Sequence, residues 1–104
     1  MKYVVKHQLD DLGRVKTVIE KAYEAYAKRL EDYSPQIKWH DDKKATVDFS
    51  VMRKKIEADF IITDEEVRIE GSIPFIFRPF QGRIERVIGE EVEKWLAKAR
   101  AGEI

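Results

Sequence analysis

The sequence predicts an α+β protein, a two-layer sandwich in which an antiparallel β-sheet carries two helices on one face, in the order β-α-β-β-β-β-α. Residues 12–34 and 79–101 place apolar side chains three or four positions apart, which is the spacing of one helix face. Residues 37–73 instead alternate apolar and polar side chains, as strands covered on one face do. Short polar segments separate these runs, which is typical of antiparallel neighbours.

The first strand is expected over residues 1–9, because its apolar side chains alternate and place His7 on the inner face. Asp10 and Asp11 can then supply capping oxygens for a helix that begins at Leu12. This helix is expected to run for about six turns. Pro35 should end it, because the residue before a proline is pushed out of the helical region.

Four further strands are expected where apolar residues recur at every second position. The turn at 53–55 is the least typical, since it has no Gly, Pro or Asn. The last helix should begin with Pro79 in its first turn and end at Gly102. The four alternating segments are 37–40, 45–51, 56–62 and 67–73.

The composition limits the classes of function that this chain can have. The 104 residues fit one domain spanning 1–104, and 20 basic against 20 acidic residues give no net charge, which argues against a nucleic-acid binder. The absence of cysteine excludes disulfides, thiolate nucleophiles and cysteine-based metal sites. No apolar run has the roughly 20 residues of a membrane span, and the N-terminus has no signal-peptide core, so we expect a cytoplasmic protein.

Few residues of the sequence are candidates for catalysis or metal binding. His7 is expected to be a satisfied buried or edge histidine, and a general base is the alternative. His40 with Asp41 and Asp42 could bind a divalent ion weakly, but a solvated turn is favoured, as it is for residues 64–66. We therefore expect no catalytic residues, no metal site and no cofactor.

The segment from Gly71 to Phe80 is the most informative one. It holds three of the five phenylalanines and two of the three prolines, and its apolar residues cannot all enter one core face. Exposed apolar surface commonly marks a binding site, although these rings could also close the end of the sheet. The candidate hydrophobic patch consists of Phe75, Ile76, Phe77 and Phe80.

Three arginines lie around the start of the last helix, where backbone N–H groups also favour anions. They form a candidate anion site, or they simply balance Glu85 and Glu90. The three are Arg78, Arg83 and Arg86.

Three stretches of sequence, residues 63–70, 73–80 and 82–85, together resemble the polyhydroxyalkanoic acid system proteins, a small bacterial family. The early His7 and the Leu12-Gly13 pair are also similar to that family, whereas the 53–55 turn lacks the glycines expected there. The resemblance implies a short cytoplasmic protein associated with polyester storage, and it carries over no catalytic residues. The predicted architecture also resembles a reduced helix-grip fold, in which any ligand cavity should be small.

Three functions remain open at this stage. The first is a non-enzymatic accessory protein that binds a hydrophobic surface or partner, such as the polyester granule or a granule-associated protein. The second is a small carrier that holds an acyl chain between the sheet and the last helix. The third is an enzyme for hydroxyacyl substrates with His7 as its base. A homodimer is also compatible with a sheet covered on one side.

Overall fold

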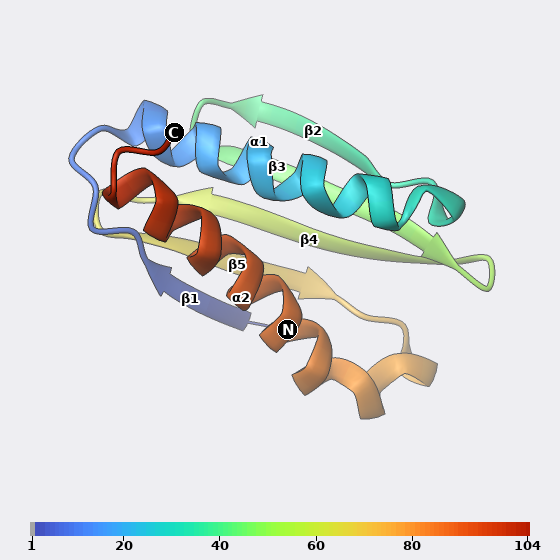
Figure 1. Ribbon diagram of the computed structural model, residues 1–104. Helices are drawn as coiled ribbons and strands as arrows, with labels where there is room; N and C mark the ends of the chain where they lie inside the picture. The colour runs from blue at the N-terminus through green and yellow to red at the C-terminus, as the bar shows by residue number, and fades with distance from the viewer. Residues whose placement is uncertain (1) are drawn as a thin grey trace.

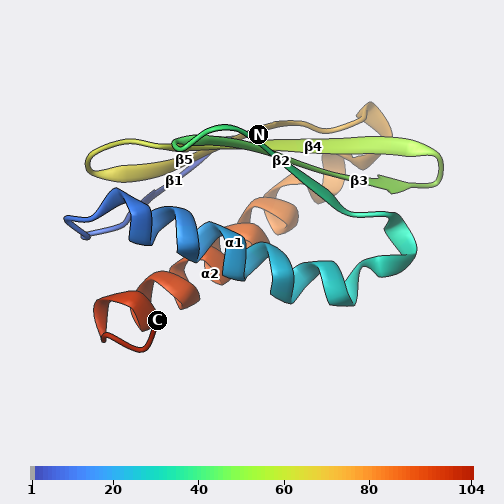
Figure 2. The ribbon, with the colours of Figure 1, turned by 90° about the horizontal axis from the view of Figure 1, so that it is seen from above.

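A single five-stranded antiparallel sheet forms one layer of the molecule, and two helices form the other. The computed structural model describes residues 2–104. The helices lie on the same face of the sheet, as Figures 1 and 2 show, so the predicted α+β sandwich is confirmed. The strand order is β1-β5-β4-β3-β2. The strands are β1 (Lys2–Lys6), β2 (Gln36–Asp41), β3 (Lys44–Val51), β4 (Lys54–Ile62) and β5 (Glu66–Ser72), and the helices are α1 (Leu12–Arg29) and α2 (Gln81–Arg100).

The two faces of the sheet differ in polarity because side chains alternate along each strand. Neighbours across β3 and β4 on the inner face are apolar, for example Ala45 opposite Phe60. Their outward neighbours are polar, and Thr46 Oγ1 donates to Asp59 Oδ1 at 2.7 Å. The buried core therefore lies between the sheet and the helices. Its largest fully buried apolar side chains are Ile19, Ile69, Leu96, Val15, Val18 and Val67.

The first strand is shorter than predicted, because β1 ends at Lys6 and not at residue 9. Gln8 has a positive φ of 56°, which turns the chain out of the strand and still leaves Leu9 buried. Asp11 then caps α1 as expected, since its side chain accepts from the backbone N–H of Gly13 at 2.9 Å.

The prediction that the first helix continues to Pro35 is wrong, since α1 ends at Arg29. A short 3₁₀ helix, η1 (Glu31–Tyr33), follows, and Ser34 adopts a left-handed conformation before the proline. Such tightening of a last turn is common at helix ends. The second helix also differs, because Pro79 lies within another 3₁₀ helix, η2 (Phe75–Phe80), and α2 begins only at Gln81.

Polar contacts join the C-terminal end of α2 to the start of α1 and to the end of β1. Near the N-terminus of α1, Arg14 donates to the carbonyl oxygen of Ala99 in α2. Arg100 at the end of α2 donates to the carbonyl oxygens of Lys6 and His7, each at 2.9 Å. From this tied end the helices diverge, so that the C-terminus of α1 and the N-terminus of α2 lie far apart (Figure 1). This divergence positions the candidate site.

Candidate functional site

A cavity of about 300 Å³ lies where the helices diverge, between the second half of α1, the first half of α2 and strands β3 and β4. Almost all of its lining is apolar, because the side chains that face it belong to the inner faces of α1, α2, β3 and β4. From the sheet come Val47, Phe49, Ile56, Ala58 and Phe60; from the helices come Ile19, Ala22, Ala27, Leu30, Ile84, Val87, Ile88 and Val92.

The size of this cavity distinguishes it from a packing defect. Enclosed voids in protein cores cost roughly 24 cal/mol per Å³, so a sealed void of this volume would cost on the order of 7 kcal/mol. That is comparable to the whole stability of a small domain. The cavity has an exposed lining residue, Arg83, and is therefore open to solvent.

Four polar or ionisable side chains accompany the apolar lining: Tyr23, Tyr26, Arg83 and Glu91. Loss of solvent raises the pKa of the Tyr23 phenol, and the negative charge of Asp48 raises it further. Burial likewise raises the pKa of Tyr26, with Glu91 adding to the effect and Arg29 opposing it. Both phenols therefore keep their protons, and act as neutral hydrogen-bonding groups, at neutral pH.

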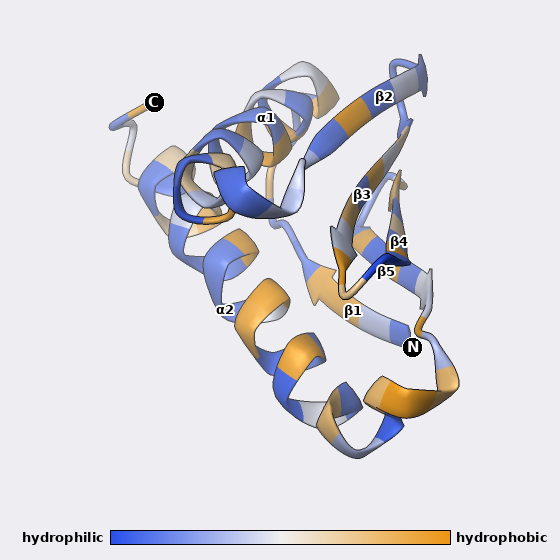
Figure 3. Cartoon of the chain, turned by 90° about the vertical axis from the view of Figure 1, so that its right-hand side faces the viewer, coloured by the Kyte–Doolittle hydropathy of each residue, from blue (hydrophilic) through white to orange (hydrophobic). Residues whose placement is uncertain are grey.

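A second apolar feature lies beside the start of α2. Phe75, Ile76 and Phe80 of η2 are 79%, 51% and 54% exposed, and we call these three residues the η2 patch. Figure 3 shows η2 as a hydrophobic segment at the end of α2. Phe77, the fourth residue of the predicted patch, is only half-exposed.

The backbone explains why these rings point outward. Pro74 precedes η2 in an extended conformation, and the N–H of Phe77 returns to the carbonyl oxygen of Pro74 at 2.9 Å. This tight turn takes the chain off the sheet after Ser72. A 3₁₀ helix has three residues per turn, so Phe75, Ile76 and Phe77 point in three different directions and cannot share one buried face.

The three arginines of the predicted anion site have different surroundings. The guanidinium of Arg78 lies over the ring of Phe75, 5.4 Å from its centre. Arg83 lines the cavity, and Arg86 is exposed on α2 without lining it. The structure thus associates one arginine with the patch and another with the cavity.

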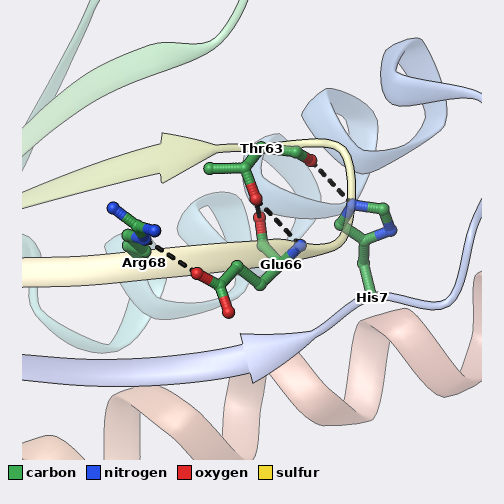
Figure 4. A network of polar contacts seen from close by, with 4 residues as sticks. All are labelled: His7, Thr63, Glu66 and Arg68. Atoms are coloured by element: carbon green, nitrogen blue, oxygen red, sulfur yellow. Dashed lines mark hydrogen bonds and ion pairs between the residues drawn. The ribbon is translucent and has the colours of Figure 1, made fainter.

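His7 is fully buried and both of its ring nitrogens are engaged. Figure 4 shows the contact of one of them with Thr63. Its Nδ1 accepts from the backbone N–H of Leu9 at 3.0 Å, and its Nε2 donates to the carbonyl oxygen of Thr63 at 2.9 Å. The side chain of Thr63 in turn bonds the backbone of Glu66, closing the turn between β4 and β5. His7 therefore joins the end of β1 to this turn, which is the structural role favoured by the sequence.

His40 lies on the exposed outer face of the sheet, where its Nε2 and the hydroxyl of Thr46 are 2.7 Å apart. Asp41 accepts from the backbone N–H of Lys43 at 2.7 Å and closes the β2–β3 turn. Across residues 2–104, no three His, Asp or Glu side chains are grouped closely enough to hold a metal ion. The polar turns at 41–43 and 64–66 thus serve chain reversal.

A sequence model of the family described as "Putative polyhydroxyalkanoic acid system protein" matches residues 4–96, which is most of the chain. The chain belongs to this family. Searches of curated proteins and of solved structures gave no match. The family match confirms the resemblance seen in the sequence, whereas the likeness to helix-grip folds stays a prediction.

For this member of the family, the sequence pointed to the η2 patch, and it predicted no more of the cavity than a small ligand space between the sheet and the last helix. The spacing of Tyr23 and Tyr26 fits the apolar face of the first helix, but both line the cavity where α1 diverges from α2. One signal could have suggested an opening. Small residues lie beside and between the tyrosines, at Ala22, Ala25 and Ala27, so this half of the helix has little volume to fill the space beneath it. Within residues 2–104, no helix is both long and apolar enough to cross a bilayer.

Proposed function

We propose that this chain is a non-enzymatic accessory protein of a polyhydroxyalkanoate system, and that it binds an apolar surface, the polyester granule or a protein on it, through the η2 patch. The observation that carries this proposal is the exposure of three large apolar side chains, Phe75, Ile76 and Phe80, within six consecutive residues. Contiguous exposed apolar side chains of this kind commonly mark interaction sites.

The chemistry of the patch suits a polyester. Burying one such side chain contributes about 1.5–3 kcal/mol, so three of them can hold the protein on an apolar particle. Arg78 lies over Phe75 and brings N–H donors to the same place. A polyester offers alkyl groups together with ester carbonyl oxygens, which accept hydrogen bonds.

A non-enzymatic role is supported by the contacts of His7. A general base needs a free nitrogen within reach of a substrate, and both ring nitrogens of His7 are bonded within a fully buried site. Neither His7 nor His40 lines the cavity described above. The family match supports the link to polyester storage.

The test is co-sedimentation of the purified protein with amorphous polyhydroxyalkanoate granules and with polystyrene beads. Phe75→Asp and Ile76→Asp alter exposed side chains, so both variants should fold, whereas Phe77 is half-buried and unsuitable. Val4→Asp is the matched control, because Val4 is exposed on the opposite face of the sheet. We expect granule binding that both η2 variants lose and the control keeps. Equal pelleting of all four proteins, or none by the wild type, would reject the proposal.

A further inference from the structure

The cavity between the diverging helices and the sheet is separate from the η2 patch. None of Phe75, Ile76 and Phe80 lines it. Its volume of about 300 Å³ falls at the lower end of small-molecule sites, which span roughly 300–1,000 Å³. An apolar cavity of about 150 Å³ holds one benzene molecule, so this one has room for an alkyl chain of about eight to twelve carbons.

The positive charge of Arg83 at the cavity favours apolar ligands that carry a negative group. Arg83 lines the cavity and is exposed, and within the described residues 2–104 its guanidinium makes no ion pair or hydrogen bond. The residues three and four positions away on the helix side are Pro79, Phe80, Arg86 and Val87, so no acidic neighbour is placed to neutralise it.

The nearby carboxylates have partners other than Arg83. Glu91 also lines the cavity, but its Oε1 accepts from Trp95 Nε1 at 3.0 Å, which directs it along α2. Asp48 acts on Tyr23 from the sheet side and lies 4.0 Å from the ammonium of Lys55. Arg83 is thus the lining cation that remains to pair with a ligand.

We infer that this cavity binds an unbranched alkanoic acid of about eight to twelve carbons, with the alkyl chain among Val87, Ile84 and Phe60 and the carboxylate at Arg83. The alkyl chain matches a lining that offers almost no polar atoms, and the carboxylate matches the planar N–H donors of an arginine. This inference goes beyond the proposed function and does not depend on it.

The experiment measures binding of decanoate and 1-decanol to the full chain by native mass spectrometry and isothermal titration calorimetry, below the concentration at which decanoate forms micelles. Arg83→Gln removes the charge at the cavity. Arg86→Gln is the matched control, since Arg86 belongs to the same helix and does not line the cavity. Ala27→Leu reduces the cavity with a residue that favours helices.

We expect one decanoate per chain in the wild type and in Arg86→Gln. Arg83→Gln should weaken the binding of decanoate at least tenfold and leave the binding of 1-decanol unchanged, because only the acid carries a charge that pairs with Arg83. Ala27→Leu should weaken both. If neither compound binds the wild type, if Arg83→Gln and Arg86→Gln behave alike, or if Ala27→Leu binds normally, the inference is wrong. Phe75→Asp should still bind decanoate. A loss of granule binding in this variant therefore concerns the η2 patch and leaves the decanoate test of the cavity unaffected.

Discussion

The phenol ring of Tyr3 in β1 packs directly against the backbone of Gly89 in α2. A Cβ atom added at Gly89 would overlap the ring carbons and the hydroxyl oxygen of Tyr3. Gly89 is buried in the middle of a 20-residue helix, where glycine is otherwise unfavourable. Its lack of a side chain allows α2 to approach the edge strand of the sheet.

Gly89→Ala should therefore destabilise the protein by up to about 2 kcal/mol. The overlap with Tyr3 costs about 1–3 kcal/mol, and the gain in helix propensity of about 1 kcal/mol offsets part of it. Urea unfolding measures the difference. In a Tyr3→Ala background the overlap is absent, so Gly89→Ala should become stabilising by up to about 1 kcal/mol. The same loss in both backgrounds would show that the ring is not the cause.

The turn between β3 and β4 can be improved. Met52 and Arg53 have φ angles of 52° and 64°, a left-handed pair that favours Asn-Gly and costs other residues about 1 kcal/mol each. Met52 is 76% exposed, so its side chain contributes little packing. Met52→Asn with Arg53→Gly should raise the free energy of unfolding by about 1–2 kcal/mol. A midpoint of unfolding that falls would contradict this account of the turn.

Replacing His7 should cost more than replacing His40. His7→Phe fills a similar space but leaves the Thr63 carbonyl and the Leu9 N–H without partners, at about 1–3 kcal/mol for each buried group. We expect a total loss of about 2–6 kcal/mol in chemical denaturation. His40→Phe is the control, because His40 is exposed, and it should change stability by less than about 1 kcal/mol. Equal losses would contradict the role given to His7.

Stability should fall at alkaline pH through the two cavity tyrosines. The folded protein raises the pKa of Tyr23 and of Tyr26 above the usual 10.0. A raised pKa means that the folded state holds the proton more tightly, so this stabilisation is complete below pH 10 and is lost as pH rises through the folded-state values. Tyr23→Phe with Tyr26→Phe should flatten the loss of stability above about pH 10, measured by urea unfolding. An unchanged slope would contradict burial of these phenols.

The sheet was predictable because the inner faces of its strands alternate without interruption, and residues such as Ala45, Val47 and Phe49 cannot be placed otherwise. The boundaries were less predictable where tertiary contacts decide them. His7 follows the alternation of β1, yet Gln8 turns the chain away so that the ring of His7 can reach Thr63. A period-two pattern does not carry that information.

The lining of the cavity was not predictable, because it depends on the angle between two helices and not on either helix alone. Arg83 was singled out for its place near the start of α2, but its lining position follows from the divergence of α1 and α2. The η2 patch was more accessible to prediction. Pro74 and Pro79 interrupt the regular spacing around Phe75, and an apolar segment without a regular spacing cannot be fully buried.

The contacts of His7 have a consequence for how the chain folds. Its bonds to Thr63 and from Arg100 join residues that are 56 and 93 positions apart in the sequence. Contacts between such distant positions form slowly, since the chain between them must first be ordered. A nascent chain cannot complete this junction until Arg100 has left the ribosome. The domain should therefore close after synthesis of nearly its whole length, and the β2–β5 meander, whose neighbours are adjacent in sequence, can form before that point.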